Sequence, residues 1–107
     1  MKESVLMIKC TLSAAAEKDL VNILEFGIDQ FGEIAAVDYY DCLAEQIQSI
    51  TASPLRYPAK DDIREGYRLC VYKSHSIYFK YQNDEVLIVR ILNGQDLENA
   101  LHLASMI

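Results

Sequence analysis

The chain has little of what specialised sites are usually built from: it contains no tryptophan, two prolines, four glycines and two histidines. The glycines are scattered, so no loop resembles those that hold phosphate groups. The two histidines, His75 and His102, lie too far apart in sequence to be a pair of zinc ligands at helical or loop spacing. The cysteines, Cys10, Cys42 and Cys70, are odd in number and widely separated, which argues against disulfides and Cys-x-x-Cys pairs. We therefore expect no cofactor and no metal site.

Long apolar runs are also missing. None approaches the roughly 20 residues that cross a bilayer, and Glu3 and Lys9 flank the first short run, unlike a secretory signal. Bases are scarce in the first half: residues 1–53 carry three lysines and nine acids, whereas residues 54–107 carry seven bases and seven acids. The net charge of −6 argues against sequence-independent binding to nucleic acid, which needs clustered Lys and Arg. We expect a cytoplasmic protein that binds neither nucleic acid directly nor a membrane.

The residues that are present favour a single folded domain over residues 1–107, because 51% of them are apolar and the length suits one domain. Residues 5–8 predict a short strand that extends to Thr11, and Ser13 stands where a helix N-cap belongs. The next segment has helical apolar spacing, with one stripe formed by Leu20, Ile23, Leu24, Gly27, Ile28 and Phe31. Gly27 on this stripe predicts close approach of another backbone, and Gly32 is expected to end the helix.

A second helix follows with almost no loop, so the two helices should form an antiparallel hairpin. Its apolar stripe is predicted at Ile34, Val37, Tyr40, Ala44, Ile47 and Ile50. Ser53 and Pro54 end this helix, because the residue before a proline avoids helical angles. Residues 54–62 are predicted to form an irregular connector.

The apolar period changes to two after the connector, which predicts strands at 67–72, 77–81 and 86–91. Turns at 73–74 and 82–84 join them in an antiparallel meander. In the last strand, strict alternation places Arg90 on the same face as Val86 and Ile88. Residues 96–105 can form a short C-terminal helix. The predicted fold is α+β, in the order β-α-α-β-β-β, with an N-terminal strand and an α-hairpin packed on one face of a small, largely antiparallel sheet.

Cationic and imidazole side chains gather in the strand half, where Arg64, Arg68, His75, Lys80 and Arg90 could converge on one surface or edge. Each also has an ordinary structural explanation. An exposed Arg64 can pair with a neighbouring acid, which contributes roughly 0–1 kcal/mol, and Arg90 can be a half-buried partner of a carboxylate. His75 can orient a backbone carbonyl or act as an acid or base. The tyrosines of the sheet fit either an interface or an amphipathic strand.

Motifs along nearly the whole chain share one order and spacing. They are Ser13–Leu20, Phe31–Gly32, Ala35 or Ala36, Tyr39 or Tyr40, Leu43, Pro54, Ile63–Arg68, Ser74–Tyr78 and Val89–Leu92. Taken together, over about residues 5–96, these motifs resemble the ParE toxins of the ParE/RelE superfamily, which belong to bacterial type II toxin–antitoxin systems. The resemblance implies a RelE/ParE-like fold and agrees with the element order derived from the apolar periodicity.

The resemblance also implies a function. ParE-like toxins inhibit DNA gyrase by binding it and so block replication and growth. Each is neutralised in a hetero-oligomer by a ParD-like antitoxin, whose flexible C-terminal segment wraps the toxin. This role implies a binding inhibitor rather than an enzyme, with no catalytic residue. The residues expected to bind the target or the antitoxin lie in the strand half: Arg64, Tyr67, Arg68, His75, Tyr78, Arg90 and Asn93.

Two alternatives stay open, and a departure from the family pattern motivates the first of them. ParE relatives commonly have a histidine after Arg-Ile-Leu, whereas Asn93 stands there in this chain, and an amide does not titrate near neutrality. A degenerate toxin that acts mainly as an antitoxin-binding module is the first alternative. A RelE-like ribosome-dependent mRNA endonuclease is the second, with Arg64, Arg68, Arg90, His75 and a tyrosine as candidates, although RNA-cleaving relatives usually have a basic surface.

Overall fold

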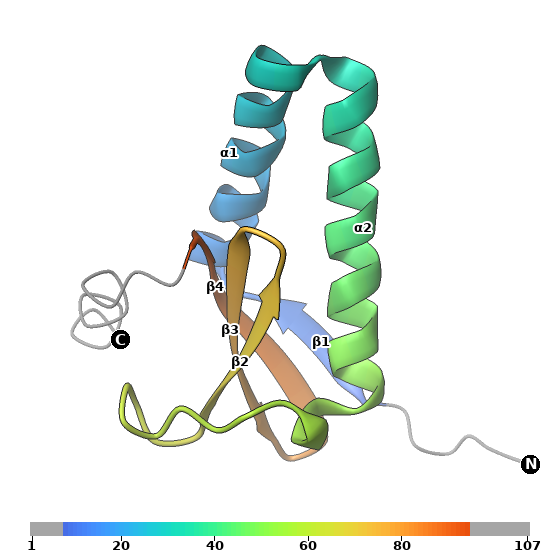
Figure 1. The fold of residues 1–107 in the computed structure, drawn as a ribbon. Helices are drawn as coiled ribbons and strands as arrows, with labels where there is room; N and C mark the ends of the chain where they lie inside the picture. Colours follow the sequence, from blue (N-terminus) through green and yellow to red (C-terminus); the bar gives the residue numbers. More distant parts are fainter. Residues whose placement is uncertain (1–7, 95–107) are drawn as a thin grey trace, which may run out of the picture.

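A pair of antiparallel helices lies across one face of a four-stranded sheet (Figure 1). The computed structural model describes residues 8–94. Along the chain the elements are β1 (Lys9–Leu12), α1 (Ala14–Phe31), α2 (Glu33–Ala52), the 3-10 turn η1 (Pro54–Arg56), β2 (Tyr67–Tyr72), β3 (His75–Gln82) and β4 (Glu85–Asn93). The predicted α+β order is confirmed. The first residues of the predicted N-terminal strand, 5–7, and the predicted helix over 96–105 lie outside the described residues.

The sheet is mixed, with the strand order β1-β4-β3-β2. β2, β3 and β4 form the antiparallel meander predicted from the period of two, and β1 pairs in parallel with the first half of β4. Asn83 and Asp84, between β3 and β4, have φ values of 55° and 57°. Positive φ at both positions is typical of the two-residue turn that matches the twist of adjacent strands. Within residues 8–94, no strand pairs with the second half of β4 on the β1 side, and α1 packs there instead.

β4 contains a β-bulge that the sequence pattern does not reveal. Tyr78 of β3 lies opposite Arg90, whereas the next residue, Phe79, lies opposite Ile88, so Val89 is an extra residue in β4. As a result, Ile88 and Ile91 both join the core beneath the helices. The strict alternation predicted over 86–91 is wrong beyond Ile88, because an inserted residue reverses the faces of the residues that follow it.

The first turns of α1 are attached to the edge of β4. Ser13 caps the helix as predicted: its Oγ accepts the amide of Ala16 at 3.0 Å and donates to the carbonyl of Val89 at 2.7 Å. Further along, a carboxylate oxygen of Asp19 accepts the amide of Ile91 at 2.9 Å. These contacts satisfy backbone groups of the helix start and of the bulged strand at the same time, and they hold α1 in register with β4.

The two helices approach most closely around Gly27. A Cβ atom built on this glycine would lie 3.1 Å from the Cβ of Ala36, which confirms the predicted close approach of another element. Gly32, with a φ of 91°, follows the last residue of α1 and caps the start of α2. Glycine adopts this backbone conformation without a Cβ clash, so the hairpin can reverse direction at a single residue.

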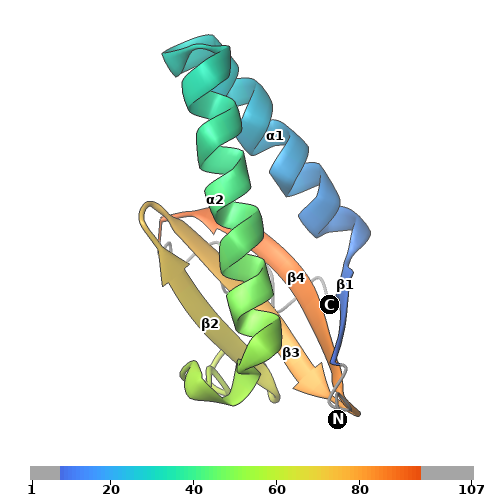
Figure 2. The ribbon, with the colours of Figure 1, turned by 90° about the vertical axis from the view of Figure 1, so that its right-hand side faces the viewer.

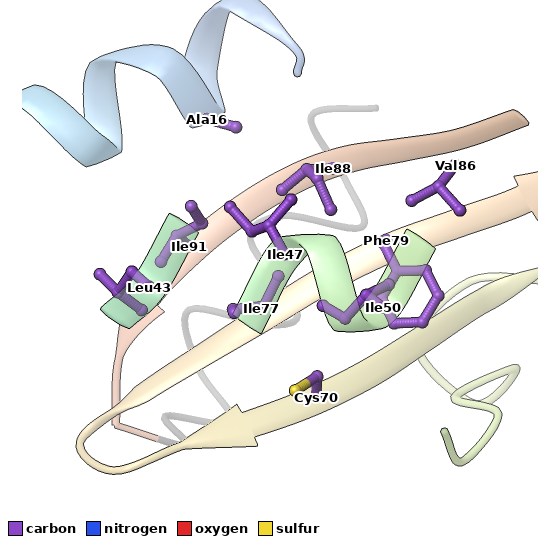
Figure 3. Packing of buried hydrophobic residues seen from close by; sticks show 10 residues of the cluster. All are labelled: Ala16, Leu43, Ile47, Ile50, Cys70, Ile77, Phe79, Val86, Ile88 and Ile91. Atoms are coloured by element: carbon purple, nitrogen blue, oxygen red, sulfur yellow. The ribbon is translucent and has the colours of Figure 1, made fainter. Parts of the chain in front are cut away.

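The main core lies between the hairpin and the sheet (Figure 3). Leu43, Ile47 and Ile50 of α2 pack with Ile77 and Phe79 of β3, and all five side chains are buried. Burying a side chain of this kind contributes roughly 1.5–3 kcal/mol. A second buried cluster lies within the sheet half, and its members are Tyr67, Leu69, Tyr78 and Val89.

The hairpin projects beyond the strands, as Figures 1 and 2 both show. In this projecting half, Phe31 is 71% exposed and Ile34 is 85% exposed. The predicted stripe of the second helix is wrong at Ile34, Val37 and Ala44, which are exposed. Ile34 stands nine residues before Leu43, about two and a half helical turns, so it lies on the opposite side of α2 from the buried residues. The buried positions of α2 are Ala36, Leu43, Ile47 and Ile50. Neither α1 nor α2 is long and apolar enough to cross a membrane.

Candidate functional site

An open groove of about 780 Å³ lies where the projecting half of the hairpin meets the ends of β3 and β4. The helices supply most of its apolar wall, including Phe26, Phe31 and Ala35, and β4 adds Ile91 and Leu92. A concave, mainly apolar surface with a few convergent polar groups is the usual form of a binding site. The polar residues that line the groove are Asp19, Asn22, Tyr39, Ser74, His75 and Asn93.

The polar end of the groove is organised around His75, at the start of β3. Its Nδ1 lies 2.7 Å from the hydroxyl of Tyr39 in α2 and 3.4 Å from the hydroxyl of Ser74. Asn93, at the end of β4, is the ladder partner of His75. Burial lowers the pKa of His75, which favours the neutral imidazole. In that state the ring can accept a hydrogen bond from Tyr39 and keep one N–H donor for another group.

Arg90 is held at the edge of the sheet by Asp19 of α1. Its Nε and Nη2 donate to the two carboxylate oxygens at 2.8 and 2.9 Å, and the Asp19 side chain is only 12% exposed. The hydrogen bonds from Arg90 to Asp19 raise the pKa of the guanidinium. This pair matches the structural explanation for Arg90, a half-buried arginine paired with a carboxylate.

The other predicted binding residues lie away from the groove. Arg68, in the edge strand β2, donates from Nη1 to the carbonyl of Tyr57 at 2.7 Å. Arg64 lies in the exposed turn that precedes β2. Tyr67 and Tyr78 are buried in the second cluster, and burial raises the pKa of Tyr67. A binding role for these four residues stays a prediction.

The structure thus brings together two of the seven predicted site residues, His75 and Asn93, in one groove. Arg68 and Arg90 do not line the groove: Arg68 donates to the Tyr57 carbonyl and Arg90 to Asp19. A shared binding surface for these two residues stays a prediction. The residues that sequence reasoning missed are the helical wall, above all Phe26 and Phe31. Their spacing is the same as that of core positions, so the sequence contains no pattern that would separate a groove wall from a core.

The lining of the groove is mainly apolar, with a few polar side chains. No lysine or arginine is among the described residues that line the groove, and its one imidazole already contacts Tyr39. Apolar walls with hydrogen-bonding groups at one end are suited to a peptide segment of a partner protein.

Comparison with known proteins places the chain in a family. The family model described as "ParE toxin of type II toxin-antitoxin system, parDE" matches residues 11–98. The chain belongs to the ParE toxin family. It is 30% identical over 92 residues to Toxin ParE1 of Caulobacter vibrioides, an alignment that covers 86% of this chain and 94% of that protein. It is 31% identical over 83 residues to Toxin ParE1 of Mycobacterium tuberculosis, covering 77% and 85% of the two chains.

The fold agrees with ParE membership. A solved structure titled "Chromosomal ParDE TA system from P. aeruginosa" matches with a TM-score of 0.74 at 18% identity, and the match covers 84% of this chain and 99% of that chain. A likeness at this identity shows the fold. The RelE/ParE-like arrangement expected from the sequence motifs is therefore confirmed.

Proposed function

We propose that this ParE-family toxin stops growth by binding DNA gyrase, and that a ParD-like antitoxin neutralises it in the cytoplasm by inserting a segment into the groove. The groove is the observation that carries the proposal. Phe26, Phe31 and Leu92 offer apolar contacts to an inserted segment, and His75 and Asn93 offer hydrogen bonds at one end. A segment that orders on binding can cover such a surface while remaining flexible in the free antitoxin.

Binding is favoured over catalysis because the charges are in the wrong places for RNA cleavage. Arg90 is bonded to Asp19 and Arg68 to the Tyr57 carbonyl, so both would have to leave these partners to reach a phosphate beside His75. Asn93 stands next to His75 in the ladder and cannot exchange protons near neutrality. These contacts support a mechanism in which the toxin inhibits its target by binding to it.

Inducible expression in a bacterial host tests the target. The expected result is growth arrest with intact mRNA, together with loss of DNA supercoiling by purified gyrase when the toxin is added and recovery when the antitoxin is added. Rapid ribosome-dependent mRNA cleavage would contradict the proposal and establish the nuclease alternative. Absence of any growth defect, with tight antitoxin binding, would instead indicate a degenerate toxin.

A pair of alanines in α2 tests the groove. Both Ala35 and Ala44 are exposed, but only Ala35 lines the groove. Ala35→Gln places a longer polar side chain in the apolar wall and should weaken antitoxin binding by about tenfold or more, the size of a disrupted central contact. Ala44→Gln is the matched control and should bind like the wild type. Equal affinities for both variants would show that the antitoxin segment does not use the groove.

A further inference from the structure

Exposed apolar side chains of the hairpin also lie outside the groove. Of the eight large hydrophobic side chains exposed within residues 8–94, six lie between residues 21 and 37. Two of these, Phe26 and Phe31, line the groove. The other four do not, and they are Val21, Ile28, Ile34 and Val37.

These four side chains share faces of the two helices with acidic residues. Val21 and Ile28 are seven residues apart in α1, and Glu25 lies between them at helical spacing. In α2, Ile34 and Val37 are followed at the same spacing by Asp41. We call this surface, made of Val21, Glu25, Ile28, Ile34, Val37 and Asp41, the outer hairpin face. Exposed apolar patches bordered by polar residues are typical of protein–protein contacts.

The charged side chains of the hairpin are nearly all of one sign, negative. Between Lys18 and Arg56 the chain has seven acidic residues and no basic residue. Among the described residues, only one of the seven, Asp19, takes part in an ion pair, the one with Arg90. A partner with basic side chains around an apolar centre would complement this surface and bind faster at low salt. A second copy of the chain is disfavoured, because it would bring two acidic faces together.

We infer that the outer hairpin face is a second binding surface, which contacts a basic and apolar surface of the protein that the toxin inhibits. The inference rests on the proposed function in that it assigns the groove to the antitoxin and the outer hairpin face to the target. The two surfaces lie on the same hairpin but share no residue. A substitution can therefore weaken binding to the target without weakening binding to the antitoxin, and the reverse.

Two double variants test the outer hairpin face: Ile34→Ser with Val37→Ser, and Glu25→Lys with Asp41→Lys. All four positions are exposed, so the fold should persist, which thermal unfolding of the purified variants checks. Matched controls of the same chemistry lie elsewhere on the surface. They are Leu55→Ser with Val71→Ser, and Asp62→Lys with Glu65→Lys.

Both test variants should lower toxicity on induction by about tenfold or more, measured as surviving colonies, while antitoxin affinity stays within about twofold of wild type. The controls should remain toxic. Raised salt should weaken gyrase inhibition by the wild type more than inhibition by Glu25→Lys with Asp41→Lys. Unchanged toxicity of the two test variants would overturn the inference. An equal loss of antitoxin affinity would also overturn it, because the face would then belong to the antitoxin.

The experiments give different results if the proposed function is wrong than if only the inference about the outer hairpin face is wrong. If the wild type arrests growth without inhibiting gyrase, and the test variants are still less toxic than their controls, gyrase is the wrong target and the outer hairpin face stands. If the wild type inhibits gyrase and the variants do so equally, gyrase is correct and the inference about this face is wrong. A wild-type chain that never arrests growth would overturn both.

Discussion

The two halves of the helical hairpin contain similar apolar residues, but those residues are buried in one half and exposed to solvent in the other. In the half that crosses the sheet, Leu43 and Ile50 of α2 are fully buried, whereas Ile34 in the projecting half of the same helix is the most exposed large hydrophobic residue described. Helical periodicity is present in both halves. The difference arises because the two sets lie on opposite sides of α2: Ile34 stands nine residues before Leu43, about two and a half turns, so it faces away from the core that Leu43 and Ile50 join. An apolar stripe thus marks a surface that needs a partner, and in the projecting half that partner is not the sheet.

The largest expected effect tests this contrast directly. Leu43→Ala should lower the free energy of unfolding by about 2–5 kcal/mol, because it removes buried methyl groups and leaves a cavity. Ile34→Ala, in the same helix, should change it by no more than about 0.5 kcal/mol. Urea unfolding of the two variants measures both. A large loss from Ile34→Ala would show that the projecting half is packed in the free protein, and the comparison would fail.

The junction between the two halves should respond with an intermediate loss. Asp19→Ala removes both hydrogen bonds from Arg90 and the acceptor for the Ile91 amide, so it should cost about 2–3 kcal/mol, since a partly buried charge loses its partner. Glu25→Ala, an exposed acid of the same helix, is the control and should be close to neutral. If the two variants unfold at the same denaturant concentration, the attachment of α1 to β4 does not depend on Asp19.

The smallest effect concerns pH. Burial lowers the pKa of His75 in the folded chain, so the unfolded chain binds a proton first as the pH falls. The contribution of His75 to stability is therefore complete above the unfolded pKa of about 6.5 and is lost as the pH falls through the folded pKa. His75→Gln keeps an acceptor for Tyr39 but cannot titrate. The stability difference between wild type and variant should shrink from pH 7.5 to pH 5, and parallel curves would contradict this.

Local features of the chain were predictable because each depends on neighbouring residues. Ser13 as a cap, Gly27 as a point of close approach, Gly32 as the reversal and the Asn83–Asp84 turn are all confirmed. The motif order also pointed to the ParE family, which the comparisons show. The residues of the candidate site were harder to predict from the sequence. His75 and Asn93 both line the groove, whereas Arg68 and Arg90 do not, because pairing between distant segments decides which residues meet there.

The amino-acid sequence alone determined which segments are helix and strand, approximately where the helices end, and the family to which the chain belongs, because caps, turns and apolar periods act over a few residues. Three features were decided only by the tertiary structure. The bulge at Val89 changed the face of Ile91, the parallel pairing of β1 left an edge of β4 for α1, and the length of the strands set where the hairpin emerges from the sheet. Each depends on contacts between residues far apart in the chain, and such contacts leave no mark on the local spacing of apolar residues.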